Sequence, residues 1–279
     1  MRVLNEPVSW WGWHGWADRP APLSIVQILR SGSLPPELAA VYWLALERGV
    51  SLLFAAEPPG AGKTTLLTAL LAFLPEEASV YFTRGWGETF DLPPLTDGVP
   101  TYILVNEMSD HLPVYSWGPY VRRTFELMAQ GYSLGTTMHA DTVDEVLEQL
   151  EGEGVPRPHL NRLGLVSTVH VGYQGGRVLR RVSEVTLLGP SDGSPGGGPS
   201  KADGIEACRI ASWDAERDTF TVLASTEQVG ALAGYLGMKE GGLRAEVERR
   251  RRFLGALMKD GVTDQEQIER ALAAFRRPA

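Results

Sequence analysis

The feature that most constrains the fold is the segment SLLFAAEPPGAGKTTLLTALLAFL at residues 51–74. Residues 51–56 are short and apolar, which predicts a buried strand, and residues 64–74 repeat leucines at helical spacing. Between them lies the glycine-rich loop GAGKT. In such a loop, backbone N–H groups and the positive end of the next helix converge on a phosphate. The segment therefore predicts a strand, a phosphate-binding loop and a helix.

The side chains of this loop indicate ATP and Mg²⁺ as ligands. Lys63 is expected to reach the β- and γ-phosphates, and the Thr64 hydroxyl is expected to hold Mg²⁺. The pattern asks for glycine five residues before Gly62, where this chain has Glu57, so a carboxylate is expected near the phosphates. The alternative is a glycine-rich turn ahead of a core helix. The residues expected to bind the nucleotide are Pro59, Gly60, Ala61, Gly62, Lys63, Thr64 and Thr65.

Composition narrows the class of protein. The net charge of −8 argues against a general nucleic-acid binder, which needs a positive footprint. A single cysteine, Cys208, forms no internal disulfide, which fits a reducing compartment. The sequence starts without a signal-peptide pattern, and no apolar run approaches the roughly 18 residues that a membrane span needs. These features predict a cytoplasmic protein without a transmembrane segment.

A second candidate site residue follows a predicted strand. Residues 101–105 (TYILV) are apolar and lead directly into Asn106, Glu107 and, further on, Asp110. An acid just past such a strand orders magnesium and the attacking water in P-loop enzymes. Glu107 is therefore the candidate for catalysis and for binding the metal, either directly or through a water. Asp110 is the second candidate for this role. The alternative is a solvated carboxylate at a strand end.

The third candidate is His139, at the end of the strand predicted for residues 133–140. Open α/β sheets bind ligands at the carboxyl ends of their strands. There, His139 is expected to bind a γ-phosphate and report the state of the nucleotide. Asp141 or Thr142 is expected to cap the helix that follows. The alternative is a packed, neutral histidine.

The remaining chain predicts an α/β fold: a P-loop (RecA-like) sheet flanked by helices, with a small C-terminal hairpin and helical module. Residues 1–22 are tryptophan-rich and show neither helix nor strand periodicity, which favours burial or a subunit contact. Arg180 and Arg181 are interpreted as pairing or subunit-contact residues, with solvated strand charges the commoner outcome. The basic run 249–252 is interpreted as a solvated or salt-bridged helix face. The predicted divisions are 1–22, a P-loop domain at 23–188, a flexible linker at 189–204 and the module at 205–279.

The predicted secondary structure outside the site completes this scheme. Helices are expected at residues 23–32, 35–49, 115–130, 227–236, 242–260 and 264–276, and strands at 78–83, 166–172, 177–186, 206–212 and 219–223.

Four motifs in this order, GAGKTT, ILVNEMSD, GTTMHADTVDEVLEQL and RRVSEV, resemble the type II/IV secretion ATPase superfamily. This superfamily powers secretion systems, type IV pili and archaella, and the chain looks most similar to its archaellum and Tad pilus branch. The resemblance runs from about residue 22 to the C-terminus, so the family's N-terminal domain is not expected here. It implies a hexameric ATPase that works with pilus or secretion platform proteins at the inner face of the membrane.

The resemblance also implies roles for individual residues. Lys63 and Thr64 match the phosphate-loop lysine and the magnesium-binding threonine, Glu107 matches the Walker B glutamate and His139 the histidine of the His box. After the second strand, only Glu88 or Asp91 stands where the family has another catalytic acid.

The chain also departs from the family pattern. Besides Glu57, Asn106 replaces a glycine and Ser109 replaces an arginine around the Walker B glutamate. Only PPLTDGVP separates the acid box from that motif, where the family has a long arginine-bearing segment. Loss of arginines that neutralise charge in phosphoryl transfer lowers the rate by orders of magnitude.

Three functions follow from these patterns. The first is a motor ATPase in which Glu107 orders water and Thr64 holds Mg²⁺. The second is a regulatory or structural subunit that binds nucleotide without turnover, or has lost binding. The third is a phosphotransferase or transport ATPase on the same fold, which the absence of an LSGGQ-like signature and the strand-end position of His139 disfavour.

Overall fold

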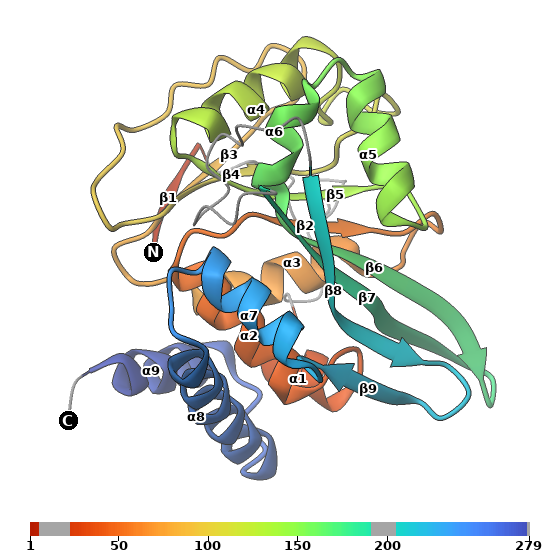
Figure 1. Cartoon of the computed structure of the whole chain (residues 1–279), viewed down its shortest axis with the longest axis vertical. Helices are drawn as coiled ribbons and strands as arrows, with labels where there is room; N and C mark the ends of the chain where they lie inside the picture. The colour runs from red at the N-terminus through yellow and green to blue at the C-terminus, as the bar shows by residue number, and fades with distance from the viewer. Residues whose placement is uncertain (6–22, 191–204, 278–279) are drawn as a thin grey trace.

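The computed structural model describes residues 1–5, 23–190 and 205–277. Within these ranges the chain forms a nine-stranded mixed sheet with helices on both faces (Figure 1). The strands are β1 (Arg2–Leu4), β2 (Leu52–Ala55), β3 (Ser79–Phe82), β4 (Thr101–Val105), β5 (Ser133–Met138), β6 (Gly164–Gln174), β7 (Arg177–Pro190), β8 (Ile205–Asp214) and β9 (Thr219–Val222). The helices are α1 (Ile25–Arg30), α2 (Pro36–Glu47), α3 (Lys63–Leu70), α4 (Pro119–Gln130), α5 (Val143–Gly152), α6 (Arg157–Leu160), α7 (Thr226–Tyr235), α8 (Glu240–Lys259) and α9 (Gln265–Arg276). Two short 3₁₀ helices, η1 (Leu71–Phe73) and η2 (Asn161–Leu163), complete the elements.

The order of the strands places three loops at one edge of the sheet. The order is β1-β3-β4-β5-β2-β6-β7-β8-β9, and all pairs from β1 to β6 are parallel. Strand β2 thus lies beside β5, and β5 lies beside β4. Because parallel strands end at the same edge, the loops that follow β2, β4 and β5 meet there.

Alternating side chains of the central strands build a core on each face of the sheet. In β2, Leu52 and Phe54 join one apolar cluster, whereas Leu53 and Ala55 join the other. The first cluster packs against α1, α2 and α3, and the second packs against α4, α5 and α6 (Figure 1). A strand buried on both faces has a continuous apolar sequence, and the apolar residues 51–56 were predicted to form a buried strand. The structure confirms the predicted α/β class.

Three details differ from the prediction. Residues 2–4 form strand β1, which pairs in parallel with β3, although no strand was expected in the first 22 residues. Three residues are too few to show a periodicity, and their partner strand lies far away in the sequence. Helix α4 begins at Pro119 rather than at residue 115. Strand β7 continues through Pro190, so the predicted start of the linker at residue 189 was wrong.

Two sequence predictions lie outside the described residues. These are the tryptophan cluster, which falls within residues 6–22, and the glycine-rich run at residues 191–204. The hairpin of β8 and β9 was predicted correctly, and it extends the same sheet because β8 pairs with β7. The division between the P-loop domain and a C-terminal module stays a prediction.

One carboxylate of α2 forms ion pairs with both α8 and α9. Glu47, at the end of α2, accepts a hydrogen bond from the indole of Trp43 at 2.8 Å. It also pairs with Arg250 of α8 at 2.6 Å and with Arg276 of α9 at 3.1 Å. The ring of Phe275 lies against Trp43 with 4.7 Å between centroids. Glu47 therefore pairs with one guanidinium group of each C-terminal helix, beside the buried ring of Trp43.

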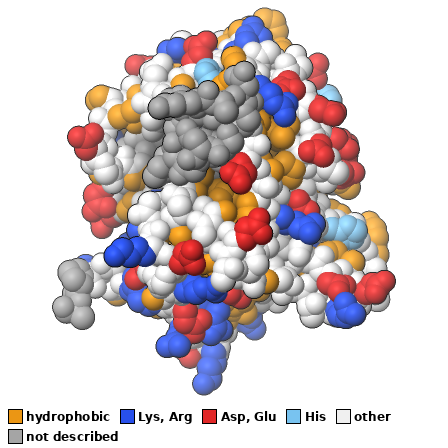
Figure 2. Space-filling view, in the orientation of Figure 1, with side chains coloured by type: hydrophobic (Ala, Val, Ile, Leu, Met, Phe, Trp, Pro, Cys, Tyr) orange, Lys and Arg blue, Asp and Glu red, His pale blue; other side chains and the backbone are white. Residues whose placement is uncertain are grey.

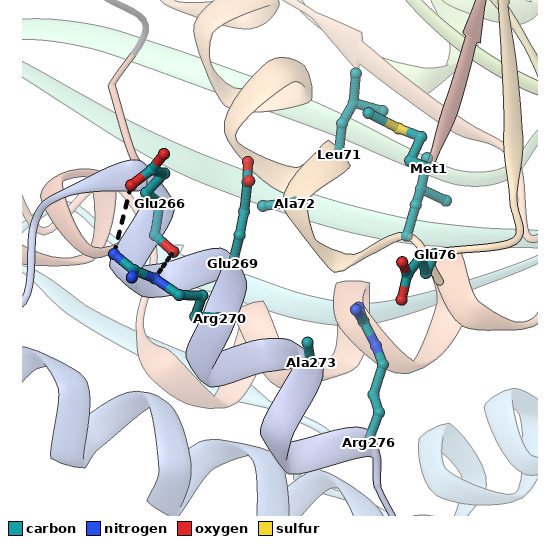
Figure 3. Close-up of a pocket in the computed structure, with 10 residues that line it drawn as sticks. Met1, Leu71, Ala72, Glu76, Glu266, Glu269, Arg270, Ala273 and Arg276 are labelled. Atoms are coloured by element: carbon teal, nitrogen blue, oxygen red, sulfur yellow. Dashed lines mark hydrogen bonds and ion pairs between the residues drawn. The ribbon is translucent and has the colours of Figure 1, made fainter.

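A cavity of about 520 Å³ lies on the other side of α9, between this helix and the segment after η1. Glu269 and Arg270 of α9 and Glu76 lie around it (Figure 3). Arg270 forms an ion pair with Glu266 within the helix. The cavity is remote from the loops at the end of β2, β4 and β5, and its charges are of both signs.

The basic run of α8 is salt-bridged, as predicted. Arg251 and Arg252 both pair with Glu248, and Arg249 pairs with Glu246. Figure 2 shows basic and acidic side chains intermingled over the lower part of the molecule, where α8 lies. None of the helices in the described ranges has the length and apolar character needed to span a membrane.

We expect Glu47→Ala to lower the free energy of unfolding by about 1–2 kcal/mol, because Arg250, which is 5% exposed, loses one of its two carboxylate partners and keeps only Glu246. Urea denaturation followed by circular dichroism measures the change. The control is Glu266→Ala on α9, whose ion pair is exposed and contributes little. Equal stability of the two variants would contradict the role given to Glu47.

A second ion pair joins β7 to the hairpin of β8 and β9. Arg181, a buried residue of β7, donates two hydrogen bonds to Asp218, at 2.8 and 2.9 Å. The indole of Trp213 donates to the same carboxylate at 2.8 Å, and Arg181 also donates to the carbonyl of Ser31. The hydrogen bonds from Arg181 and then Trp213 lower the pKa of Asp218 to about 2.

This pKa shift predicts how stability depends on pH. Because the pKa of Asp218 is lower in the folded state, its contribution is present above about pH 4 and is lost as the pH falls toward 2. After allowance for the 39% exposure of the side chain, we expect a loss of about 1 kcal/mol. Urea denaturation between pH 5 and pH 2.5 should therefore show a shallower fall for Asp218→Asn than for the wild type. The exposed Asp97→Asn serves as the control and should match the wild type; an unchanged slope in Asp218→Asn would refute the assignment.

Candidate functional site

The loop between β2 and α3 has the backbone of a phosphate-binding loop. Gly60 and Gly62 have positive φ angles of 74° and 92°, which favour glycine. A side chain at Gly60 would meet no atom within 4 Å, so space lies beside the loop. Helix α3 starts at Lys63 without a side-chain cap, so its first N–H groups are available to an anion. This loop, at the positive end of a helix, suits a phosphate group.

Lys63 is buried at the bottom of the loop. Its side chain is 6% exposed, and its ammonium group donates a 2.8 Å hydrogen bond to the carbonyl of Ala56. Burial lowers the pKa of Lys63, and the nearby carboxylates of Glu107 and Glu57 partly oppose this shift. The ammonium group thus lies in a place where its charge is poorly solvated, and a phosphate would supply a better partner than one carbonyl.

His139 connects the phosphate loop to the carboxylate at the end of β4. Its Nδ1 lies 2.8 Å from the carbonyl oxygen of Glu57 and 3.4 Å from Lys63 Nζ. Its Nε2 lies 3.2 Å from Oε1 of Glu107. A neutral imidazole has one N–H and one acceptor nitrogen, so Nδ1 either donates to the carbonyl of Glu57 or accepts from the ammonium of Lys63, according to the tautomer. The contacts therefore join Lys63, His139 and Glu107 into one group.

Glu107 is buried at the end of β4, 4% exposed, and accepts a 3.1 Å hydrogen bond from the Ser109 hydroxyl. Burial, with the charge of Glu107, raises the pKa of Tyr115 above its usual range. The side-chain oxygen of the neighbouring Asn106 is buried and has no hydrogen-bond partner in the described part of the chain. A buried polar atom without a partner indicates a place for a bound water or ligand.

The residues present fit a bound Mg²⁺ ion. The Thr64 hydroxyl, at the start of α3, and the Glu107 carboxylate supply hard oxygen donors, and Mg²⁺ is bound by few protein oxygens together with phosphates and waters. No cluster of three or more histidine, cysteine or acidic side chains able to hold a metal occurs among the described residues. The magnesium assignment of Thr64 and Glu107 stays a prediction.

Glu57, which replaces the expected glycine, has an exposed side chain. Its backbone is held in place by the loop after β5: its N–H donates to Asp141 Oδ1 at 3.2 Å, and its carbonyl contacts His139. Thr142 caps α5, as one of the two predicted alternatives, and the Gln149 side chain donates to the carbonyl of His139. Asp141 is thus a positioning residue that was predicted only as a possible cap.

Glu88 lies apart from this group. It is buried and accepts hydrogen bonds from the Tyr81 hydroxyl and from the N–H groups of Arg84 and Phe90, at 2.6–2.7 Å. Burial, followed by the contact with Glu88, raises the pKa of Tyr81 to about 12. In the described structure no hydrogen bond or ion pair joins Glu88 to Lys63, Glu107 or His139. Its predicted catalytic role stays a prediction.

Arg180 is a residue of this region that the sequence did not assign to the loop. Its Nε donates a 3.0 Å hydrogen bond to the carbonyl of Gly60, although the two residues are far apart in the sequence. Its Cδ lies 3.3 Å from the point where a side chain at Gly62 would begin. The sequence motif RRVSEV contains Arg180. Its contact with Gly60 depends on the position of β7 relative to the phosphate loop, which the sequence does not show.

Comparisons with known proteins give distant similarities. No protein-family model matches the chain. Uncharacterized protein MJ0900 of Methanocaldococcus jannaschii is 25% identical over 91% of this chain and 49% of its own length. Uncharacterized protein MJ1287 of the same organism is 24% identical over 87% of this chain and 94% of its own length. The chain therefore spans about half the length of the first relative and most of the second.

Among solved structures, the chain is similar to the VirB11 ATPase of the Brucella suis type IV secretion system, with 21% identity and a TM-score of 0.40 over 57% of this chain and 54% of that one. It is also similar to the ATPase DotB of Legionella pneumophila, with 13% identity and a TM-score of 0.35 over 88% of this chain and 65% of that one. The ATPase DotB of Yersinia pseudotuberculosis is 14% identical, with a TM-score of 0.35 over 91% of this chain and 63% of that one. The first of these structures is named as an ATPase of a type IV secretion system, and the other two are named as ATPases.

The burial of Lys63 predicts opposite effects of Lys63→Met on stability and on binding. We expect the free energy of unfolding of the ligand-free protein at pH 7 to rise by about 1 kcal/mol, because a poorly solvated charge is removed. At the same time, stabilisation by MgATP should disappear. Urea denaturation and thermal melting with MgATP measure the two effects. The exposed Lys239→Met is the control and should change neither; a clear loss of stability in the ligand-free Lys63→Met protein would contradict the prediction.

Proposed function

We propose that this chain binds and hydrolyses ATP at the loop between β2 and α3. The observation that carries the proposal is the set of contacts from Lys63 through His139 to Glu107. Lys63 begins the helix after β2, whereas Glu107 and His139 directly follow the neighbouring parallel strands β4 and β5. A carboxylate, an imidazole and an ammonium group next to an uncapped helix start provide the parts that phosphoryl transfer to water requires.

In this proposal each residue has a distinct role. Lys63 turns from the carbonyl of Ala56 to the β- and γ-phosphates, where its charge is better compensated. Glu107 orients the attacking water and accepts its proton, and His139 holds the carboxylate in position. A bound Mg²⁺ would neutralise charge on the phosphate oxygens. Thr64 and Glu107 would hold this ion, directly or through water.

We further propose that the ATPase serves a type II/IV secretion or type IV pilus machine. The support is the order of the four sequence motifs. On this proposal the chain works in the cytoplasm as a homo-oligomer, a hexamer by resemblance, against platform proteins of the inner membrane.

A second candidate is a regulatory or structural subunit of such a machine that binds nucleotide with little turnover. Three departures around the site favour it. Glu57 brings a negative charge to the loop, Ser109 stands in place of an arginine, and the segment PPLTDGVP is too short to carry arginines to the phosphates.

The test is ATP binding and steady-state hydrolysis by the purified chain. We expect Lys63→Ala to lose binding, and Glu107→Gln to bind MgATP while its turnover falls at least about 100-fold. Asp110→Asn is the matched control, since this acid follows the same strand and should leave turnover nearly unchanged.

Each outcome separates the two candidates. Turnover that Glu107→Gln removes supports the ATPase. Binding without turnover in the wild type supports the regulatory subunit. If Asp110→Asn abolishes turnover and Glu107→Gln does not, the assignment of Glu107 is wrong.

A further inference from the structure

A cavity of about 300 Å³ adjoins the outer side of the phosphate loop, away from His139 and Glu107. The loop residues Gly60 to Gly62 and Thr65 of α3 form one side. Thr65 follows Lys63 by two positions, and residues two apart point to opposite sides of a helix. The loop therefore separates the Lys63 side, which suits the reacting phosphates, from a second space.

The walls of this cavity combine apolar and hydroxyl groups. Ile28 of α1 and Val178 of β7 supply apolar surface. The hydroxyls of Ser31 and Ser33 also line it, and they lie 2.8 Å apart in a mutual hydrogen bond. A mostly apolar space with a few polar groups next to a phosphate loop suits a nucleoside.

Arg180 stands between the cavity and the loop. It lines the cavity, and its Nε is held by the carbonyl of Gly60 at 3.0 Å. Within the described ranges it forms no ion pair, whereas the neighbouring Arg181 is paired with Asp218. The side chain is exposed, and its positive charge lies beside an anion-binding loop in a protein of net charge −8.

We infer that Arg180 is a nucleotide-binding residue: its guanidinium binds a phosphate of a nucleoside di- or triphosphate whose nucleoside occupies the adjoining cavity. The inference rests on the proposed function. A guanidinium has five N–H donors in a fixed fork. Arg180 can therefore keep its Nε on the carbonyl of Gly60 and turn its terminal nitrogens to phosphate oxygens, without breaking the contact that the structure shows.

In this role Arg180 supplies a second positive charge to the bound phosphates, in addition to that of Lys63. The short segment PPLTDGVP offers no arginine, and Lys63 is the one lysine or arginine in the loop sequence EPPGAGKTT at residues 57–65. Arg180 reaches the loop from β7, on the side opposite to His139, so the two faces of the bound phosphates would each meet a cation.

The test is isothermal titration of the full chain with MgADP and with inorganic pyrophosphate. We expect Arg180→Gln to weaken both ligands by about tenfold or more, the size of effect that a charge-assisted phosphate contact produces. Arg177→Gln is the matched control, because it removes the same charge from the exposed turn of the same hairpin. It should bind both ligands within about twofold of the wild type.

A second variant tests the cavity. Val178→Trp adds bulk at a residue that is 45% exposed, so folding should be retained, and circular dichroism verifies this. We expect it to weaken MgADP at least about fivefold and to leave pyrophosphate unchanged, because only the nucleoside needs the cavity.

The outcomes are distinguishable. Wild-type affinity for MgADP in Arg180→Gln, with binding lost in Lys63→Ala, overturns the inference and leaves the proposed function standing. Wild-type affinity in Val178→Trp overturns the placement of the nucleoside. Failure of the folded wild type to bind MgADP or MgATP overturns the proposed function together with this inference.

Discussion

The parallel pairing of β2 with β5, and of β5 with β4, is the constraint on which the candidate site depends. It brings the ends of three strands to one edge of the sheet, so the phosphate loop, Glu107 and His139 meet although long stretches of sequence separate them. The pairing is fixed by burial on both faces: side chains of β2 alternate between two apolar clusters, and a shift of one residue would exchange them. Packing of the core therefore also sets the geometry of the site.

Lys63, His139 and Arg180 each contact a carbonyl group of the phosphate loop or of the residues just before it. Lys63 is held by Ala56, His139 by Glu57 and Arg180 by Gly60. A single neutral carbonyl is a weaker partner for a cation than a phosphate. Lys63 and Arg180 are thus kept near the loop, beside the place expected for a phosphate.

The chain carries this site despite departures from the sequence pattern that it resembles. Glu57 leaves its carboxylate exposed and uses its backbone for the contacts that position the loop, so the residue is compatible with the geometry. Its charge still acts on Lys63, where it partly opposes the lowering of the pKa. A carboxylate near the phosphates would weaken binding of an anion. The positive charge of Arg180 beside the same loop would offset this effect.

The sequence by itself determined the elements and their local chemistry. The apolar run before GAGKT indicated a buried strand, and the loop motif and the residues after the later strands indicated Lys63, Glu107 and His139, because periodicity and loop composition are local properties. Tertiary structure alone decided which loops meet. The pairing of β1 with β3 and the contact of Arg180 with Gly60 both depend on partners distant in the chain. Such contacts follow from strand order and packing, which no local pattern encodes.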